Sequence, residues 1–153
     1  MASTLYRIPI SAWVLDTAQA MDAAHAPDEA AWRKDWADAY WALGGARDSI
    51  ARKPCPRSAA YGLWHLGWLK GSSRPVLDWP VERIRDQLSK NAAYAVIAAL
   101  VLAREGFAGS HSALWQRVQR EFQAETGESP AESDQGAVRV ALSLFLDGTL
   151  VSP

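Results

Sequence analysis

The chain has 153 residues, 49% of them hydrophobic and 22% charged, which is typical of one folded globular domain and excludes a largely disordered one. The formal net charge of −1 excludes the strongly basic balance of a dedicated nucleic-acid-binding domain. The single cysteine, Cys55, excludes an internal disulfide. Because the N-terminal residues also lack a signal-peptide pattern, we expect a cytoplasmic protein.

The first 45 residues predict a pair of helices. The first helix begins near Pro9, and its apolar face recurs at helical spacing: Val14, Ala18, Met21 and His25. The second begins near Pro27, with Asp28 at its positive end, and stops at Gly44. Its inward face is Trp32, Trp36, Tyr40 and Leu43.

Residues 46–150 predict the rest of a helical bundle. After a short helical piece near residues 47–52, helices over about 56–69 and 92–105 are apolar nearly all round, which is typical of central helices. Amphipathic helices are expected to cover them, over about 80–88, 110–126 and 133–147. No segment shows the alternation of a strand. The sequence therefore predicts a single all-α domain over residues 1–153, with about seven helices around two central ones.

Proline and short polar residues mark the expected helix starts. Pro56 is expected in the first turn of its helix, and Asn91 is expected to cap the next apolar helix. The expected caps of the last two helices are Ser110 or Ser112 and then Ser133 or Asp134. The longest apolar run, residues 92–103, is too short to cross a bilayer, so we expect no membrane partner.

Reaction chemistry has few candidates in this chain. No two histidines lie at metal-ligand spacing and no phosphate-binding loop is present, so we expect neither a metal nor another cofactor. Cys55 is a candidate reactive thiol, because Lys53, Arg57 and a helix N-terminus would favour the thiolate. His65 lies ten residues further along the same expected helix, about 15 Å away, and cannot serve as its base. A capping or buried cysteine is the alternative.

Tryptophan is unusually frequent, with eight in the chain. Helical spacing predicts that six belong to the core: Trp13, Trp32, Trp36, Trp64, Trp68 and Trp115. Trp41 departs from the apolar stripe of its helix, and Trp79 lies between a loop and a helix. These two are expected at the surface, where tryptophan favours protein interfaces, unless they cover the edge of the core.

Positive charge is concentrated in the middle of the chain. Residues 52–90 contain eight Lys or Arg and three Asp or Glu, whereas the segments on either side are net acidic. We expect this region to bind a larger protein or nucleoprotein complex, although its arginines could instead pair with the acidic helices. Direct nucleic-acid binding is not expected, since the cations lie in loops and not on one recognition helix. The expected partner-binding residues are Arg52, Lys53, Arg57, Lys70, Arg74, Trp79, Arg83 and Trp41.

One stretch resembles a known sequence motif. CPRSAAYGLWHLGWLKG, residues 55–71, is similar to the Cys-Pro-basic-x-Ala-aromatic-Gly-Leu motif of a family of small bacterial helical domains of unknown function. The matching residues are Cys55, Pro56, Arg57, Ser58, Ala59 or Ala60, Tyr61, Gly62, Leu63, Gly67, Lys70 and Gly71, followed downstream by Asn91, Tyr94, Ala95, Leu114 and Trp115. The resemblance covers about residues 45–150 and implies a compact helical domain without an established activity. The extra tryptophans and the longer N-terminal helical pair depart from it.

These observations favour a non-enzymatic protein-interaction domain. Small phage-encoded inhibitors of host defence complexes, such as anti-CRISPR proteins, have this size and type, and that role is our first functional hypothesis. A thiol-dependent enzyme or redox sensor using Cys55 is the alternative, and a nucleic-acid-binding adaptor is the second. The sequence does not indicate an oligomeric state.

Overall fold

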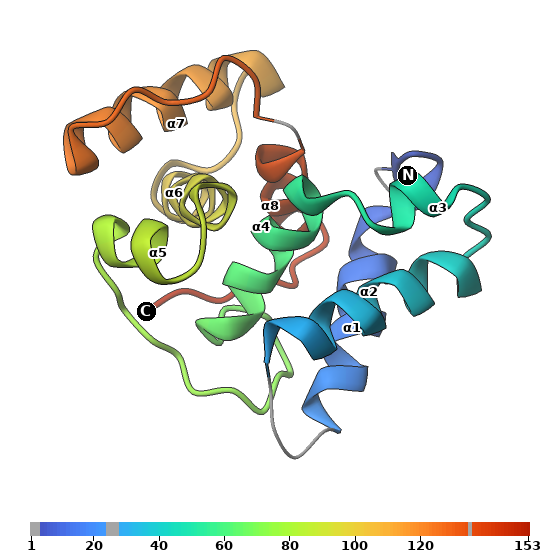
Figure 1. Cartoon of the computed structure of the whole chain (residues 1–153). Helices are drawn as coiled ribbons and strands as arrows, with labels where there is room; N and C mark the ends of the chain where they lie inside the picture. Colours follow the sequence, from blue (N-terminus) through green and yellow to red (C-terminus); the bar gives the residue numbers. More distant parts are fainter. Residues whose placement is uncertain (1–3, 24–27, 135) are drawn as a thin grey trace.

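The structure is a computed structural model that describes residues 4–23, 28–134 and 136–153 (Figure 1). The described elements are β1 (Thr4–Leu5), β2 (Ile8–Pro9), α1 (Ile10–Asp22), α2 (Glu29–Ala42), α3 (Asp48–Ala51), α4 (Pro54–His65), α5 (Val81–Gln87), α6 (Lys90–Glu105), α7 (His111–Thr126) and α8 (Ala137–Leu146). Seven helices in the described ranges have seven or more residues, and α3 has four. The prediction of an all-α domain with about seven helices is therefore confirmed.

The helices α4 and α6 form the centre of the bundle, as their apolar sequences predicted. They pack against each other, and α8 packs against both. On one side, α5 and α7 cover α6. On the other, α1 and α2 form a pair that contacts α8 and α4 (Figure 1). Burial of α6 is nearly continuous over residues 92–99, which explains why its sequence lacks a polar face.

Gly62 allows α4 and α6 to approach closely. A Cβ at this position would lie 2.4 Å from the Cβ of Ala92 and 3.1 Å from its Cα. Glycine in a helix costs about 1 kcal/mol relative to alanine. Here that cost is offset by the packing of two helix backbones that a side chain would separate.

The C-terminal end of α4 differs from the prediction. The expected helix over 56–69 ends at His65, because Gly67 adopts a φ of +76° and turns the chain away. A Cβ on Gly67 would also lie 2.1 Å from the carbonyl oxygen of Pro75. Leu66, Trp68 and Leu69 are buried without being helical. Their apolar character made the predicted helix one turn too long.

The N-terminal end of α4 also differs. Lys53 is the N-cap and Pro54 occupies the first turn, so the helix begins before Pro56. Cys55 therefore lies inside the first turn and does not precede it. Proline suits either position, because the first-turn N–H groups have no intrahelical acceptor.

Two of the other expected helix caps were wrong and one was right. Ser89, and not Asn91, caps α6: its Oγ accepts a hydrogen bond from the N–H of Ala92 at 3.0 Å. Ser110 caps α7 in the same way, as predicted. The N-cap of α8 is Gly136, although Asp134 Oδ2 still accepts from the N–H of Val138 at 3.2 Å.

At the start of α2, Asp28 is the N-cap, and its Oδ1 accepts from the N–H of Ala31 at 2.6 Å. This carboxylate supports the positive end of the helix, as expected. The expected roles of His25 and Pro27 fall outside the described residues.

A short β-hairpin precedes α1, whereas the sequence predicted no strand. Thr4 pairs with Pro9 and Leu5 with Ile8, and the turn between them has φ values of +53° at Tyr6 and +67° at Arg7. Positive φ at both central residues is the pattern of a type I′ turn, which normally carries Asn-Gly or a similar pair. Tyrosine and arginine cost about 1–2 kcal/mol each in this region, so the usual sequence signal of a hairpin is missing.

Aromatic rings fill the interface between the N-terminal helices and α4. The six tryptophans predicted to be core residues are all buried, at 8% exposure or less. Trp13 stacks on Trp36 with ring centroids 4.2 Å apart, and Trp32 stacks on Trp64 at 5.5 Å. Trp36 Nε1 is buried and has no hydrogen-bond partner within the described ranges. Dense aromatic packing therefore attaches the α1–α2 pair to the centre of the fold.

Candidate functional site

The predicted partner-binding residues on either side of α4 fall into two groups. Arg52, Lys53 and Arg57 lie at the N-terminal end of α4, whereas Lys70, Arg74, Trp79 and Arg83 follow its C-terminal end. A helix of 12 residues separates the two groups by about 18 Å. Trp41 lies on α2 and is 44% exposed, so it is a surface aromatic as predicted.

At the C-terminal end, Arg74 is engaged within the fold. Its Nε and Nη2 donate to the carbonyl oxygen of His65 at 3.2 and 2.8 Å, and its guanidinium lies 5.0 Å from the ring centre of Trp64. The last carbonyls of a helix lack intrahelical donors and carry negative partial charge. Arg74 therefore caps α4, where it joins the loop to the helix.

Trp79 is only partly buried and contacts its own chain on both sides. Its ring lies edge-on to His65 with centroids 5.5 Å apart, and the Arg83 guanidinium lies 3.9 Å from its centre. Burial lowers the pKa of His65, and the positive charge of Arg74 lowers it further. This end of α4 thus presents a compact aromatic and cationic layer, whereas Lys70 remains exposed.

At the N-terminal end, each of the three cations contacts a different neighbouring group. The ammonium of Lys53 lies 5.3 Å from the ring centre of Tyr6, and a hydrogen bond with Tyr6 raises its pKa. Arg57 Nη1 donates to the carbonyl oxygen of Arg52 at 3.1 Å, and burial lowers the pKa of Arg57. Arg52 forms an ion pair with Asp48.

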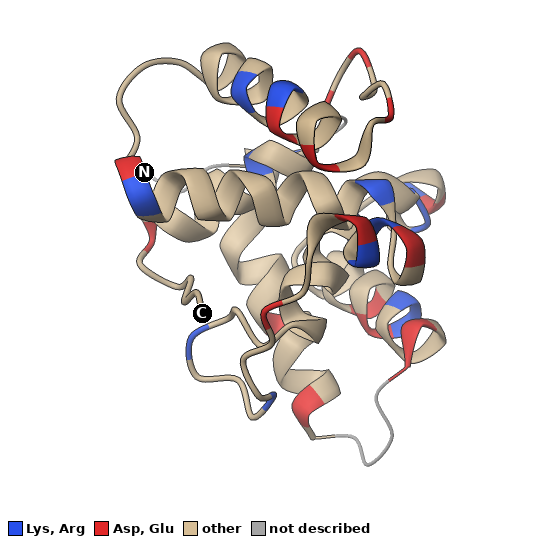
Figure 2. Cartoon of the chain, turned by 90° about the vertical axis from the view of Figure 1, so that its left-hand side faces the viewer, with Lys and Arg blue, Asp and Glu red and all other residues tan. Residues whose placement is uncertain are grey.

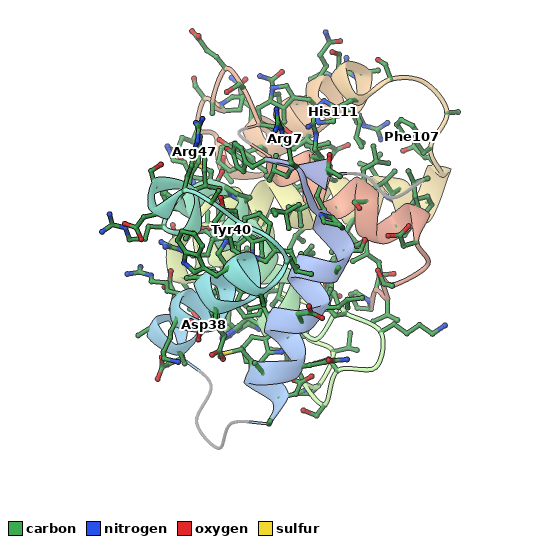
Figure 3. All side chains as sticks on the ribbon, turned by 90° about the vertical axis from the view of Figure 1, so that its right-hand side faces the viewer. Arg7, Asp38, Tyr40, Arg47, Phe107 and His111 are labelled. Atoms are coloured by element: carbon green, nitrogen blue, oxygen red, sulfur yellow. The ribbon has the colours of Figure 1, made fainter. Side chains whose placement is uncertain are left out.

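Two further arginines, which sequence reasoning missed, join this end. Arg7 at the hairpin tip and Arg47 before α3 both line a pocket of about 530 Å³ (Figure 3). We call this cavity the α3 pocket. It is lined by Tyr6, Arg7, Ile8, Tyr40, Leu43, Gly44, Gly45, Ala46, Arg47 and Ile50.

The wall of the α3 pocket is built around Tyr40. Its hydroxyl oxygen accepts hydrogen bonds from the N–H groups of Ala46 and Arg47, both at 3.1 Å. Gly45 packs directly on the ring, since a Cβ there would lie 2.2 Å from Tyr40 Cε2. Tyr40 is only 3% exposed, so the loop after α2 is fixed in place over this ring.

We define the α3 basic surface as Arg7, Arg47, Arg52, Lys53 and Arg57. Segments 4–9 and 43–57 contribute these five cations and one carboxylate, Asp48. Within the described ranges, Arg52 alone of the five lies within ion-pair distance of a carboxylate. Counting charges by segment did not identify Arg7 and Arg47 as part of a basic surface, because both belong to an N-terminal region that is net acidic.

The opposite side of the molecule has a different charge pattern. Figure 2 shows Lys and Arg interspersed with Asp and Glu on that face. Several of these charges are paired, for example Lys90 and Arg85 with Glu128 and Arg117 with Glu105. Interspersed and paired charges make a weak electrostatic field, in contrast to the α3 basic surface.

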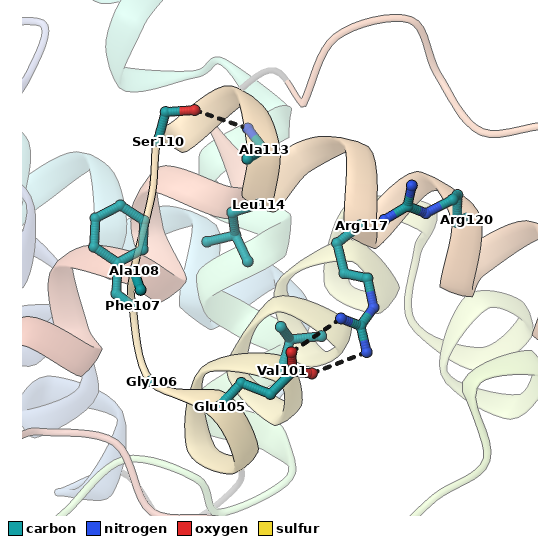
Figure 4. Close-up of a pocket in the computed structure, with 10 residues that line it drawn as sticks. All are labelled: Val101, Glu105, Gly106, Phe107, Ala108, Ser110, Ala113, Leu114, Arg117 and Arg120. Carbon is teal, nitrogen blue, oxygen red and sulfur yellow. Dashed lines mark hydrogen bonds and ion pairs between the residues drawn. The ribbon is translucent and has the colours of Figure 1, made fainter.

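A second, smaller hollow of about 250 Å³ lies between α6 and α7 (Figure 4). Arg117 crosses it and bridges Glu105 and Glu121, so its charge is neutralised. Phe107, 37% exposed, lies on the loop that borders the hollow, and Arg120 lines its far side. This hollow therefore serves as a matched reference for the α3 pocket, with an aromatic and an arginine but little net charge.

Cys55 is partly buried in the first turn of α4. His65 lies ten residues along the same helix, about 15 Å away by the helical rise. His111 Nε2 lies 3.1 Å from Asp134 Oδ2, and His25 falls outside the described residues. The reactive-thiol hypothesis stays a prediction.

Two other kinds of site are absent from the part of the chain that the structure describes. There, no cluster of three or more His, Cys, Asp or Glu side chains is placed to bind a metal ion. In the same residues, no helix combines the length and apolar character that spanning a membrane requires.

The chain matches the model of one known protein family. The model of a family of unknown function, DUF6979, matches residues 14–151. The chain belongs to the DUF6979 family. Neither the curated proteins nor the solved structures that were compared gave a match. In this DUF6979 protein, the match begins inside α1, so the β-hairpin with Tyr6 and Arg7 lies before the matched region.

Proposed function

We propose that this chain is a non-enzymatic binding domain that docks onto an acidic surface of a larger protein or nucleoprotein complex through the α3 basic surface. The observation that carries the proposal is the gathering of Arg7, Arg47, Arg52, Lys53 and Arg57 in segments with one carboxylate. Clustered cations that few carboxylates neutralise raise the local concentration of acidic partners and speed their association.

Trp41 supplies the apolar part of the docking surface. Its exposed ring lies edge-on to Tyr40, a wall of the α3 pocket, with centroids 5.3 Å apart. Tryptophan and arginine are the residues that contribute most often to protein-interface affinity. An acidic protein segment that also carries an apolar side chain would contact both the cations and the ring of Trp41.

The overall charge of the chain and the positions of its cations favour a protein partner over a nucleic acid. The chain as a whole has a pI of about 6.3, below the range of domains that bind nucleic acid through phosphate contacts. The cations come from a hairpin tip, a loop and two helix ends, and not from one helix that could enter a groove. These features favour a protein surface. A phage-encoded inhibitor of a host defence complex remains the first role to test, and it rests on chain size and composition alone.

Site-specific photo-crosslinking tests the proposal. A photoreactive phenylalanine analogue replaces Trp41 in one variant and Phe107 in another, since Phe107 is the exposed aromatic beside the reference hollow. We expect a discrete crosslinked protein from the native host at position 41 and not at position 107.

The captured protein is then purified and titrated with charge variants. Arg52→Glu combined with Trp41→Ala should weaken binding at least about tenfold, whereas Arg120→Glu combined with Phe107→Ala should leave it unchanged. Binding should also weaken as salt rises. Equal effects of the two variants, or capture of nucleic acid in place of protein, would overturn the proposal.

A further inference from the structure

The α3 pocket has properties that docking of a flat protein surface does not use. Its volume of about 530 Å³ lies in the range of pockets that take small organic ligands. Its lining combines apolar side chains, Leu43 and Ile50, with two arginines. Such a mixture of an apolar wall and a few fixed polar groups is typical of a ligand site.

The two arginines of the pocket form no ion pair with the described part of the chain. Within the described ranges, neither Arg7 nor Arg47 has a carboxylate within ion-pair distance. Arg7 comes from the hairpin and Arg47 from the loop before α3, so the pocket draws its positive charge from two segments. Guanidinium groups recognise carboxylate and phosphate oxygens through paired hydrogen bonds.

Tyr40 adds a polar group that is almost completely buried. Its oxygen accepts two backbone hydrogen bonds, which leaves its own hydroxyl hydrogen to donate. An anionic oxygen bound in the pocket would be an acceptor for that hydrogen.

The hairpin tip holds Tyr6 and Arg7 beside the pocket in a backbone conformation that neither residue favours. Strained residues of this kind persist where their side chains are needed in a fixed position. Tyr6 offers a planar ring, and Arg7 offers a cation next to it. A ligand with a planar body and an anionic group would contact both.

From these observations we propose that the α3 pocket binds a small organic anion, a carboxylate or phosphate attached to a planar aromatic or heterocyclic body. Arg7, Arg47 and the Tyr40 hydroxyl hold the anionic group, and the Tyr6 ring, which the Lys53 ammonium also approaches, contacts the planar body. The pocket shares Arg7 and Arg47 with the proposed docking surface, whereas the docking residues Arg52 and Trp41 do not line the pocket.

Calorimetric titration with matched pairs of probes tests the inference. The carboxylate arm compares 2-naphthoate with neutral 2-naphthylmethanol, and the phosphate arm compares adenosine monophosphate with adenosine and with inorganic phosphate. We expect at least one of the two organic anions to bind. Its neutral twin, and phosphate alone, should bind at least about tenfold more weakly. Equal binding of a neutral twin, or no binding by either anion at millimolar concentration, would overturn the proposal.

Variants locate the site. The double substitution Arg7→Ala with Arg47→Ala should weaken binding of the anion at least about tenfold. Tyr40→Phe should weaken this binding about threefold to tenfold. Replacing the strained turn by Tyr6→Asn with Arg7→Gly should raise Tm while it lowers affinity for the anion. Unchanged affinity in the double arginine variant would show that the anion binds elsewhere and would refute the assignment.

A control separates this inference from the proposed function. The docking variant, Arg52→Glu with Trp41→Ala, should keep its affinity for the small anion. If it does so while losing the protein partner, both proposals stand. If the small anion fails to bind while docking persists, the pocket assignment alone is refuted.

Discussion

The two ends of α4 have similar side chains and different roles. At the C-terminal end, Arg74 caps the last carbonyls of the helix and Arg83 covers Trp79. At the N-terminal end, Arg52 pairs with the exposed Asp48 and Lys53 lies over the ring of Tyr6. The difference follows from the helix itself, because its C-terminal carbonyls attract cations and its N-terminal N–H groups do not. The cations at this end therefore contact other groups, with Arg57 donating to the carbonyl oxygen of Arg52, and none of their side chains caps α4.

The largest expected effect comes from the middle of α4, which keeps both ends in place. Gly62→Val would drive a side chain into Ala92 and separate α4 from α6. We expect a loss of about 3 kcal/mol in the free energy of unfolding, measured by urea denaturation. The control is Ala103→Val on the exposed side of α6, which should cost less than about 1 kcal/mol. Equal midpoints for the two variants would contradict the close approach.

Arg74→Ala should destabilise the fold more than a substitution at the N-terminal end of α4. It removes two hydrogen bonds from a charged group to the carbonyl oxygen of His65, and we expect a loss of about 2 kcal/mol in unfolding free energy. Arg52→Ala at the other end should change stability by less than about 0.5 kcal/mol, because its ion pair with Asp48 is exposed. Comparable losses from both substitutions would remove the distinction between a structural and an available arginine.

The smallest expected effect is a pH dependence at the C-terminal end. The folded state lowers the pKa of His65 below its usual value near 6.5, through burial and the charge of Arg74. The unfolded state then binds more protons in this range, so stability should fall as the pH drops below about 6.5 and level off below the folded pKa. His65→Gln should flatten that part of the profile in urea denaturation at several pH values. A profile with the same slope would contradict a role for His65.

Helical periodicity was enough to predict the architecture. It identified the central pair α4 and α6 and the core tryptophans, because apolar residues at spacings of three and four determine which face of a helix is buried. It failed at the C-terminal end of α4, where Leu66, Trp68 and Leu69 are buried in a loop. An apolar sequence pattern indicates that residues are buried, but it does not indicate whether the buried segment is helical.

The candidate site could be predicted only in part. Arg52 and Lys53 were found because they lie in a basic segment, but Arg7 and Arg47 are 40 residues apart and meet only in the folded chain. The hairpin that positions Arg7 has Tyr-Arg at a turn that usually requires Asn-Gly, so no local signal marks it. The sequence therefore could not indicate the strained backbone conformation of Tyr6 and Arg7.

Charge reversal at each end of α4 tests whether the α3 basic surface is the docking site. The purified partner captured through position 41 is titrated against charge reversals at the two ends of α4, Arg52→Glu with Lys53→Glu and Lys70→Glu with Arg83→Glu. We expect the first pair to weaken binding at least about tenfold and the second to change it less than about twofold. If the second pair weakens binding as much as the first, the α3 basic surface is not the docking site.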